Sequence, residues 1–186
     1  MKLDILAFGA HPDDVEMGCG GTIAKSTSLG KKVGIIDLTR GEMGTRGTAS
    51  ERDAEAIESS NILGLHVRDN LKFRDCFFEI SEEHLIKVIE QIRRFRPSIV
   101  LCNAVNDRHP DHSRASRLIS RACFLSGLSK IKTSFNYVGK VVDDGFIRYI
   151  RYFCYESFDG FFEDFSFFIA KVSFFVLCFI NVVVKV

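Results

Sequence analysis

Short apolar runs alternate with helical patterns over the first 135 residues, and this alternation restricts the possible folds more than any other feature. The apolar runs have the length of buried strands and lie at residues 3–10, 31–39, 97–104 and, more weakly, 66–73. Helical patterns occupy residues 50–64 and 81–95. Parallel strands need crossover connections, which are usually helices. The pattern therefore predicts an α/β fold, a three-layer sandwich with a mostly parallel sheet.

The two helical segments carry recognisable end signals. Residues 50–64 begin with Ser50 and Asp53 in capping-box spacing and end on Gly64, and Ser81 precedes the segment 81–95. We therefore expect Ser50 and Ser81 to cap these helices.

Polar clusters follow three of the expected strands. They lie at residues 11–14, 40–48 and 106–112. Ligands of open parallel sheets bind outside the carboxyl ends of the strands. The three loops are therefore expected to meet in one crevice.

Two of these clusters, "HPDD" at residues 11–14 and "HPDH" at residues 109–112, contain metal-binding side chains. A single His-Pro-Asp is usually a turn with an aspartate cap. Two such clusters at the carboxyl ends of parallel strands favour a metal site instead. A catalytic zinc usually takes three ligands from histidine and carboxylate and leaves a position open for water. His11, Asp14 and His112 supply such a set.

The remaining side chains of the two clusters suit hydrolysis. Zinc lowers the pKa of bound water from about 15.7 to roughly 7, and a neighbouring carboxylate can accept the released proton. Asp13 is the expected base. A protonated His109 is expected to stabilise the oxyanion beside the metal, with Asp111 orienting the His109 ring.

Several charged side chains in the same loops are candidates for substrate binding, because a guanidinium suits a substrate carboxylate. Arg52 is preferred, since a cation in the first turn of a helix is unfavourable for the helix dipole. The other candidates are Arg40, Arg46, Arg108, Glu42 and Thr45.

Composition narrows the function classes. The net charge is +1, from 25 basic and 24 acidic residues, so no overall field favours nucleic acid. The six cysteines are scattered without close spacing, which indicates reduced thiols and a cytoplasmic protein. The apolar run at the N-terminus is too short for a secretory signal.

The character of the sequence changes near residue 136. Twelve of the 18 phenylalanines lie at or after Phe135, and residues 158–186 show no clean periodicity. The longest uncharged run there, residues 172–184, is shorter than the roughly 20 residues of a spanning helix, so a membrane anchor is not favoured. We therefore divide the chain into a core, residues 1–135, and an atypical terminus, residues 136–186, which is either diverged or translated out of frame.

The paired motifs resemble those of the LmbE-like, or PIG-L-type, zinc-dependent N-acetylglucosamine deacetylases. The resemblance implies a Rossmann-like sheet and zinc, with ferrous iron as the alternative, on His11, Asp14 and His112. It also implies that Asp13 is the general base, which returns its proton to the leaving amine, and that His109 is the electrostatic stabiliser.

The segment "DLTRGEMGTRGT" resembles the bacillithiol-biosynthesis branch, which deacetylates N-acetylglucosaminyl malate. This implies a small amino-sugar substrate, substrate contacts from Arg52 and Arg108, and a homo-oligomer. Family members normally continue for about another hundred residues that have no counterpart after Asn136. The alternative is therefore an inactive remnant that keeps the metal-binding core.

Overall fold

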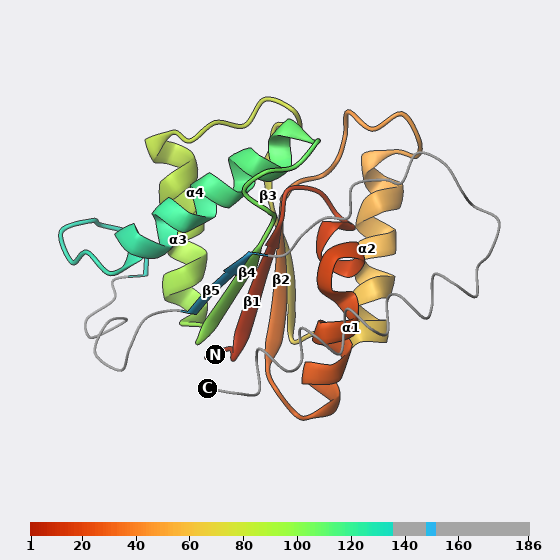
Figure 1. Ribbon diagram of the computed structural model, residues 1–186, viewed down its shortest axis with the longest axis horizontal. Helices are drawn as coiled ribbons and strands as arrows, with labels where there is room; N and C mark the ends of the chain where they lie inside the picture. The colour runs from red at the N-terminus through yellow and green to blue at the C-terminus, as the bar shows by residue number, and fades with distance from the viewer. Residues whose placement is uncertain (136–147, 152–186) are drawn as a thin grey trace. The chain divides into compact units, whose positions relative to one another are not determined.

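Five parallel strands form one sheet in the order β3-β2-β1-β4-β5 in the computed structural model, which describes residues 1–135 and 148–151 (Figure 1). The strands are β1 (Ile5–Gly9), β2 (Val33–Thr39), β3 (Val67–Phe73), β4 (Ile99–Cys102) and β5 (Arg148–Arg151). All four strand expectations from the apolar runs are confirmed, including the weak one at β3.

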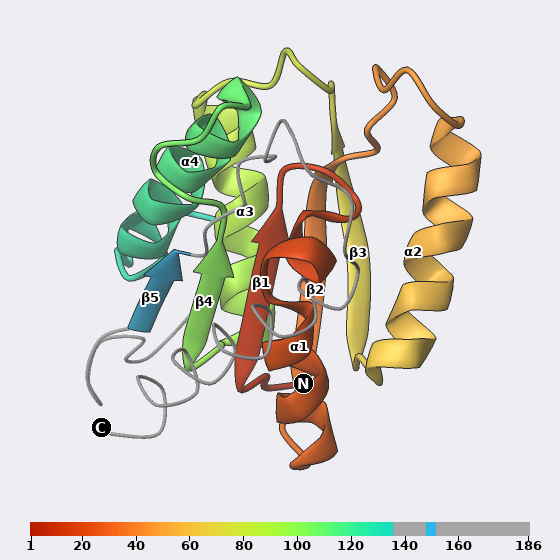
Figure 2. The ribbon, with the colours of Figure 1, turned by 45° about the vertical axis from the view of Figure 1, so that its right-hand side comes forward.

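Four helices within the described residues cover the two faces of this sheet. They are α1 (Asp14–Ser28), α2 (Ala49–Leu63), α3 (Glu82–Phe95) and α4 (Pro110–Ser126). Figures 1 and 2 show α1 and α2 on one face and α3 and α4 on the other. The α/β sandwich with a parallel sheet is therefore confirmed.

The central strand β1 is buried on both faces. Because side chains alternate along a strand, Leu6 and Phe8 enter the larger core beneath α3 and α4, whereas Ile5 and Ala7 enter the smaller core beneath α1. All four of these residues are buried. This explains why residues 3–10 form an uninterrupted apolar run.

The strand order places a topological switch point between β1 and β4. The chain passes from β1 to β2 and β3 on one side, then returns to place β4 on the other side of β1. The loops after β1 and β4 therefore lead to helices on opposite faces, and ligands of open α/β sheets typically bind at the carboxyl ends of two such strands. The "HPDD" and "HPDH" clusters meet there.

Helix ends agree with the sequence in part. The Ser81 side chain caps α3 by accepting from the His84 amide at 3.3 Å, and Gly64 ends α2 in the left-handed conformation with φ 65°. The capping box expected from Ser50 and Asp53 is wrong. Thr48 caps α2, and its capping box is completed by Glu51.

Asp53 is unavailable to the α2 cap because its carboxylate pairs with the Arg40 guanidinium. Thr48 has the extended backbone, ψ 162°, that an N-cap needs. The helix therefore begins two residues earlier than the spacing of polar residues suggested.

Most of the expected atypical terminus, residues 136–186, lies outside the described residues. Within it the structure describes the strand β5, which pairs in parallel with β4. Among the described helices none is both long enough and apolar enough to cross a membrane.

Candidate metal centre

The turn after β1 brings His11 and Asp14 together. The His11 amide donates to Asp14 Oδ2 at 3.0 Å, and the His11 carbonyl accepts from the Asp13 amide at 3.0 Å. A Cβ at Gly9 would lie 2.9 Å from the His11 carbonyl oxygen, so only glycine permits this close turn. Asp13 adopts a positive φ of 154°, a strained conformation of the kind that clusters at functional sites.

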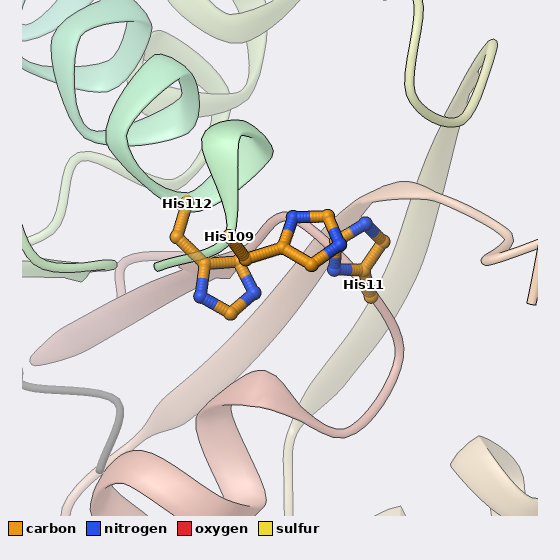
Figure 3. A group of neighbouring side chains, drawn as sticks. All are labelled: His11, His109 and His112. Carbon is orange, nitrogen blue, oxygen red and sulfur yellow. The ribbon is translucent and has the colours of Figure 1, made fainter. Parts of the chain in front are cut away.

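The start of α4 supplies the other two histidines. Pro110 occupies the first turn, and His109 is the N-cap residue, whose Nδ1 accepts from the Asp111 amide at 3.2 Å. His112 follows one turn later, with its ring centroid 4.8 Å from that of His109. Figure 3 shows these two rings descending from α4 beside His11.

One nitrogen of His11 and one of His112 face the same carboxylate. His112 Nε2 lies 3.1 Å from Asp14 Oδ1, and His11 Nδ1 lies 3.6 Å from Asp14 Oδ2. The other nitrogens lie beside different carboxylates: His11 Nε2 is 3.1 Å from Asp75 Oδ1, and His112 Nδ1 is 3.0 Å from Asp107 Oδ2. Histidines that bind metals are typically held by a carboxylate on the second nitrogen in this way.

This donor set fits a metal ion. The ligand trio expected from the sequence, His11, Asp14 and His112, is in mutual contact through Asp14, and two imidazoles with one carboxylate suit zinc. Two groups among the described residues have potential ligand atoms that all lie within 4.8 Å of one another, and this trio is not one of them: the first is His11, His109 and His112, and the second is His11, Asp75 and Asp111. The trio stays the predicted ligand set, and Asp75 and Asp107 lie beside its two histidines.

The charges at the centre are strongly coupled. Burial alone would raise the pKa of Asp14, but its hydrogen bonds to His11 and His112 outweigh burial and hold that pKa well below its usual range. Burial lowers the pKa of His11, yet Asp14 and Asp75 outweigh it and the net pKa is raised. Asp14 is therefore ionised and ready to act as a ligand.

Asp13 lies next to the centre but faces outward. Its side chain is 52% exposed, and its Oδ2 lies 3.9 Å from Arg52 Nη1. Partial burial and the neighbouring Asp14 charge raise the pKa of Asp13, against the opposing Arg52. A carboxylate with a raised pKa is a better proton acceptor, as a general base requires.

His109 differs from the protonated residue that the sequence led us to expect. Burial, together with the nearby His11 and His112, lowers the pKa of His109. Because Nδ1 accepts from the Asp111 amide, the proton of the neutral ring resides on Nε2. His109 can therefore still donate a hydrogen bond to a developing oxyanion.

Asp111 reaches His109 through its backbone amide. Its carboxylate is 1% exposed and faces other groups: Oδ2 lies 3.4 Å from His11 Nε2 and accepts from the Cys76 amide at 3.0 Å, and Oδ1 pairs with Arg114. Asp111 thus ties the β3–α3 loop to the start of α4.

Three residues of the centre were missed by sequence reasoning. Asn103 is fully buried at the end of β4, accepts from the Ala10 amide at 3.0 Å and donates to Asp14 Oδ2 at 3.0 Å. Asp75 and Asp107 are the outer partners of the histidines. Asp107 lies two positions before the "HPDH" motif, whereas Asp75 lies 64 residues from His11 and carries no local signal.

The expected substrate-binding residues separate into two groups. Arg52 and Arg46 line a cavity of about 480 Å³ together with Asp13, Glu51 and Glu55. The other four lie elsewhere. Glu42 Oε1 accepts from the Asp75 amide at 2.8 Å, and Arg40 pairs with Asp53. Thr45 and Arg108 are exposed in loops.

Comparisons with known proteins identify relatives of the chain. The chain is 34% identical to an uncharacterized deacetylase, YaiS, of Escherichia coli over 64% of this chain and 67% of that protein. It is 34% identical to the diacetylchitobiose deacetylase of Thermococcus kodakarensis, over 70% of this chain and 52% of that protein. The chain thus spans about half the length of the latter relative.

Among solved structures, the conserved protein TT1542 of Thermus thermophilus superposes with a TM-score of 0.73 and 41% identity, covering 94% of this chain and 77% of that one. The model of the family described as "PIG-L: GlcNAc-PI de-N-acetylase" matches residues 6–123, a span that begins in β1 and ends within α4 and so contains both histidine clusters. The chain therefore belongs to the PIG-L family of de-N-acetylases.

Proposed function

We propose that the chain hydrolyses the N-acetyl group of an N-acetylglucosaminyl conjugate and releases acetate. The observation that carries this proposal is the convergence of His11 and His112 on the Asp14 carboxylate, with the exposed Asp13 directly beside them. The proposed substrate within this class is N-acetylglucosaminyl malate, as used in bacillithiol biosynthesis. The identity to the diacetylchitobiose deacetylase favours diacetylchitobiose as the second candidate.

His11, Asp14 and His112 would hold the ion, zinc or alternatively ferrous iron. When bound, such an ion polarises the acetamide carbonyl and lowers the pKa of water. Asp13 takes the proton from the attacking water, whose oxygen adds to the carbonyl carbon. The Nε2–H of His109 donates to the carbonyl oxygen as the tetrahedral centre forms.

The same residues complete the reaction. The protonated Asp13 returns its proton to the sugar nitrogen, the carbon–nitrogen bond breaks, and the free amine and acetate leave. The raised pKa of Asp13 suits both halves of this cycle, because the group must first accept a proton and then release it.

Substrate selection is assigned to the loop after β2, the first turn of α2 and the loop after β4. Arg52 and Arg46, in the cavity beside Asp13, bind the conjugate's acidic group, and Arg108 approaches from the loop before α4. Glu42 acts by supporting the Asp75 loop. We also propose that the chain is cytoplasmic and that it forms a homo-oligomer.

The test is release of free amine from N-acetylglucosaminyl malate and from diacetylchitobiose by the zinc-loaded chain. Asp13→Ala should lower turnover by at least about 10²-fold, as expected for loss of a general base. Asp69→Ala, which removes an exposed carboxylate from β3, is the matched control and should keep full turnover.

The pattern of turnover on the two substrates distinguishes the possible functions. Turnover of the malate conjugate alone supports the bacillithiol assignment, and turnover of diacetylchitobiose alone transfers the proposal to the second substrate. A folded, zinc-binding chain that releases no amine from either compound would contradict the proposal and favour the inactive remnant.

A further inference from the structure

Two glycines of the turn after β2 enclose the Arg52 side chain. A Cβ at Gly41 would lie 3.0 Å from Arg52 Nη1, and a Cβ at Gly44 would lie 3.0 Å from Arg52 Nη2. Both distances are shorter than ordinary van der Waals contact. The guanidinium group therefore occupies space that is open only because neither neighbour carries a side chain.

The turn that carries these glycines is fixed to the end of β1. The Gly44 amide donates to the Gly41 carbonyl at 3.1 Å, and Gly41 is buried with a φ of 63°, which favours glycine. The Gly41 amide donates to Thr39 Oγ1 at 3.1 Å, and the Thr39 hydroxyl donates to the Ala10 carbonyl at 2.8 Å. The turn thus has a defined position relative to the start of the metal centre.

Packing, rather than hydrogen bonding, holds the guanidinium in place. Among the residues that the structure describes, it pairs with one carboxylate, with 3.9 Å between Nη1 and Asp13 Oδ2, and its nitrogens donate no hydrogen bond. The Arg52 side chain is 22% exposed and lines the cavity of about 480 Å³ beside Asp13. The N–H donors of Arg52 are therefore available to a ligand in that cavity.

Two of the three glutamates that line the cavity are engaged by other donors. Glu51 accepts from the Thr48 amide at 2.6 Å. Glu16 accepts from the Ser59 hydroxyl at 2.8 Å and pairs with Arg68. These contacts draw both carboxylates away from the guanidinium, which leaves it free for an anionic group of a ligand.

We infer that Gly41 and Gly44 form a cradle that holds Arg52 ready for an anionic group of the substrate. An arginine side chain loses rotamer freedom when it binds a ligand, and one that packing already fixes loses less. Gly44 is thereby a positioning residue, which acts on the substrate through Arg52. The inference rests on the proposed function and adds to it the residues that select the charge of the conjugate.

The first experiment compares an anionic substrate, N-acetylglucosaminyl malate, with a neutral one, diacetylchitobiose, in the zinc-loaded chain. Gly44→Ala should raise KM for the malate conjugate by about tenfold, as expected for loss of one hydrogen bond to a charged group. Its kcat should stay within about threefold, because an anionic group away from the acetamide is bound alike in ground state and transition state. KM for diacetylchitobiose should change by less than about twofold.

Gly20→Ala is the matched control for this substitution. A Cβ at Gly20, on α1, would meet no atom within 4 Å, so the change adds the same methyl group in open space. It should leave KM for both substrates unchanged. Gly41 is less suitable for substitution, because its φ of 63° would strain any other residue.

The second experiment repeats Gly44→Ala in an Arg52→Ala background. There the added methyl group no longer meets a guanidinium, so KM for the malate conjugate should not rise further, and the urea midpoint should fall less than in the parent. The Gly44 Cβ would also lie 3.1 Å from the Gly41 carbonyl oxygen. That contact is present in both backgrounds, so its effect cancels in the comparison.

Equal effects of Gly44→Ala in the two backgrounds would overturn the cradle and leave the proposed function in place. Equal rises in KM for the two substrates would overturn it as well, because the loss would not depend on ligand charge. Turnover of diacetylchitobiose alone would overturn the selection of an anionic group, although deacetylation would stand. If neither substrate yields amine, the proposed function fails and the selection fails with it, whereas the urea midpoints still decide whether Gly44 packs against Arg52.

Discussion

Asp107 Oδ2 lies 3.0 Å from Nδ1 of His112, whose Nε2 in turn lies 3.1 Å from Asp14 Oδ1. A carboxylate thus lies beside the second nitrogen of a predicted metal ligand, the position from which outer partners orient metal-binding histidines. Loss of such an outer partner typically reduces metal affinity by about 10- to 100-fold.

Asp107→Ala should therefore weaken zinc binding by about that factor while leaving the fold intact. Competition with a chromophoric chelator measures the zinc affinity, and Asp69→Ala, on β3, serves as the control. Unchanged zinc affinity in Asp107→Ala would show that His112 needs no partner on Nδ1.

Asn103 is expected to hold the two metal-binding loops together. It joins the Ala10 amide after β1 to Asp14 at the start of α1, and it is fully buried. Asn103→Leu leaves the Ala10 amide without this partner, which should cost roughly 1–3 kcal/mol in the free energy of unfolding.

The Asn103→Asp variant tests whether Asn103 positions Asp14 for the metal or only stabilises the fold. It keeps an acceptor for the Ala10 amide but places a second carboxylate beside Asp14, so the stability of the metal-free chain should fall while added zinc restores it in part. Urea unfolding with and without zinc measures both effects. A zinc response equal to that of the parent would contradict the positioning role.

Thr48 and Ser50 provide a test of which residue caps α2. Thr48→Ala should lower the free energy of unfolding by about 1 kcal/mol, since it removes the side chain that accepts from the Glu51 amide. Ser50→Ala should stay within about 0.5 kcal/mol, as is usual for exposed positions. If Ser50→Ala lowers the free energy of unfolding more than Thr48→Ala does in thermal or urea unfolding, the capping box of Ser50 expected from the sequence would be supported instead.

Glu51 gives the same cap a pH dependence. Hydrogen bonds from the Thr48 backbone and hydroxyl lower the pKa of Glu51. A lowered folded-state pKa contributes stability above the unfolded value, near 4.3, that is lost as the pH falls through the folded value. The difference in stability between parent and Glu51→Gln should therefore shrink on acidification.

The contribution of Asp37 to the free energy of unfolding should change with pH in the opposite direction to that of Glu51. It is 2% exposed in β2, and burial raises its pKa to about 7 against the opposing charge of Arg68, which lies 2.8 Å away. A raised folded-state pKa contributes stability that is complete below the unfolded value, near 3.9, and is lost as the pH rises through about 7.

The parent should accordingly lose stability relative to Asp37→Asn between about pH 4 and pH 7. Urea unfolding of both chains across this range measures the difference. A gain of the parent over Asp37→Asn with rising pH would mean that the pair with Arg68 keeps Asp37 ionised throughout.

Local sequence predicted four of the five described strands and two of the four described helices. Apolar runs of strand length predict strands because parallel strands are buried on both faces, as Phe8 and Ala7 of β1 show. The "HPDD" and "HPDH" clusters indicate a metal because histidine and carboxylate combine there at strand ends. The cap of α2 was misplaced because several adjacent hydroxyl and carboxyl side chains satisfy the same spacing, and only backbone conformation selects Thr48.

The sequence by itself determined the alternation of strands and helices and the chemistry of the two histidine clusters, since both depend on residues close together in the chain. Tertiary structure alone decided which groups complete the centre. Asp75, which follows β3, reaches His11 across 64 residues. Asn103 reaches Asp14 across 89, because β1 and β4 are neighbours in the sheet although the chain between them forms two other strands. Such contacts depend on strand order, and no local pattern encodes strand order.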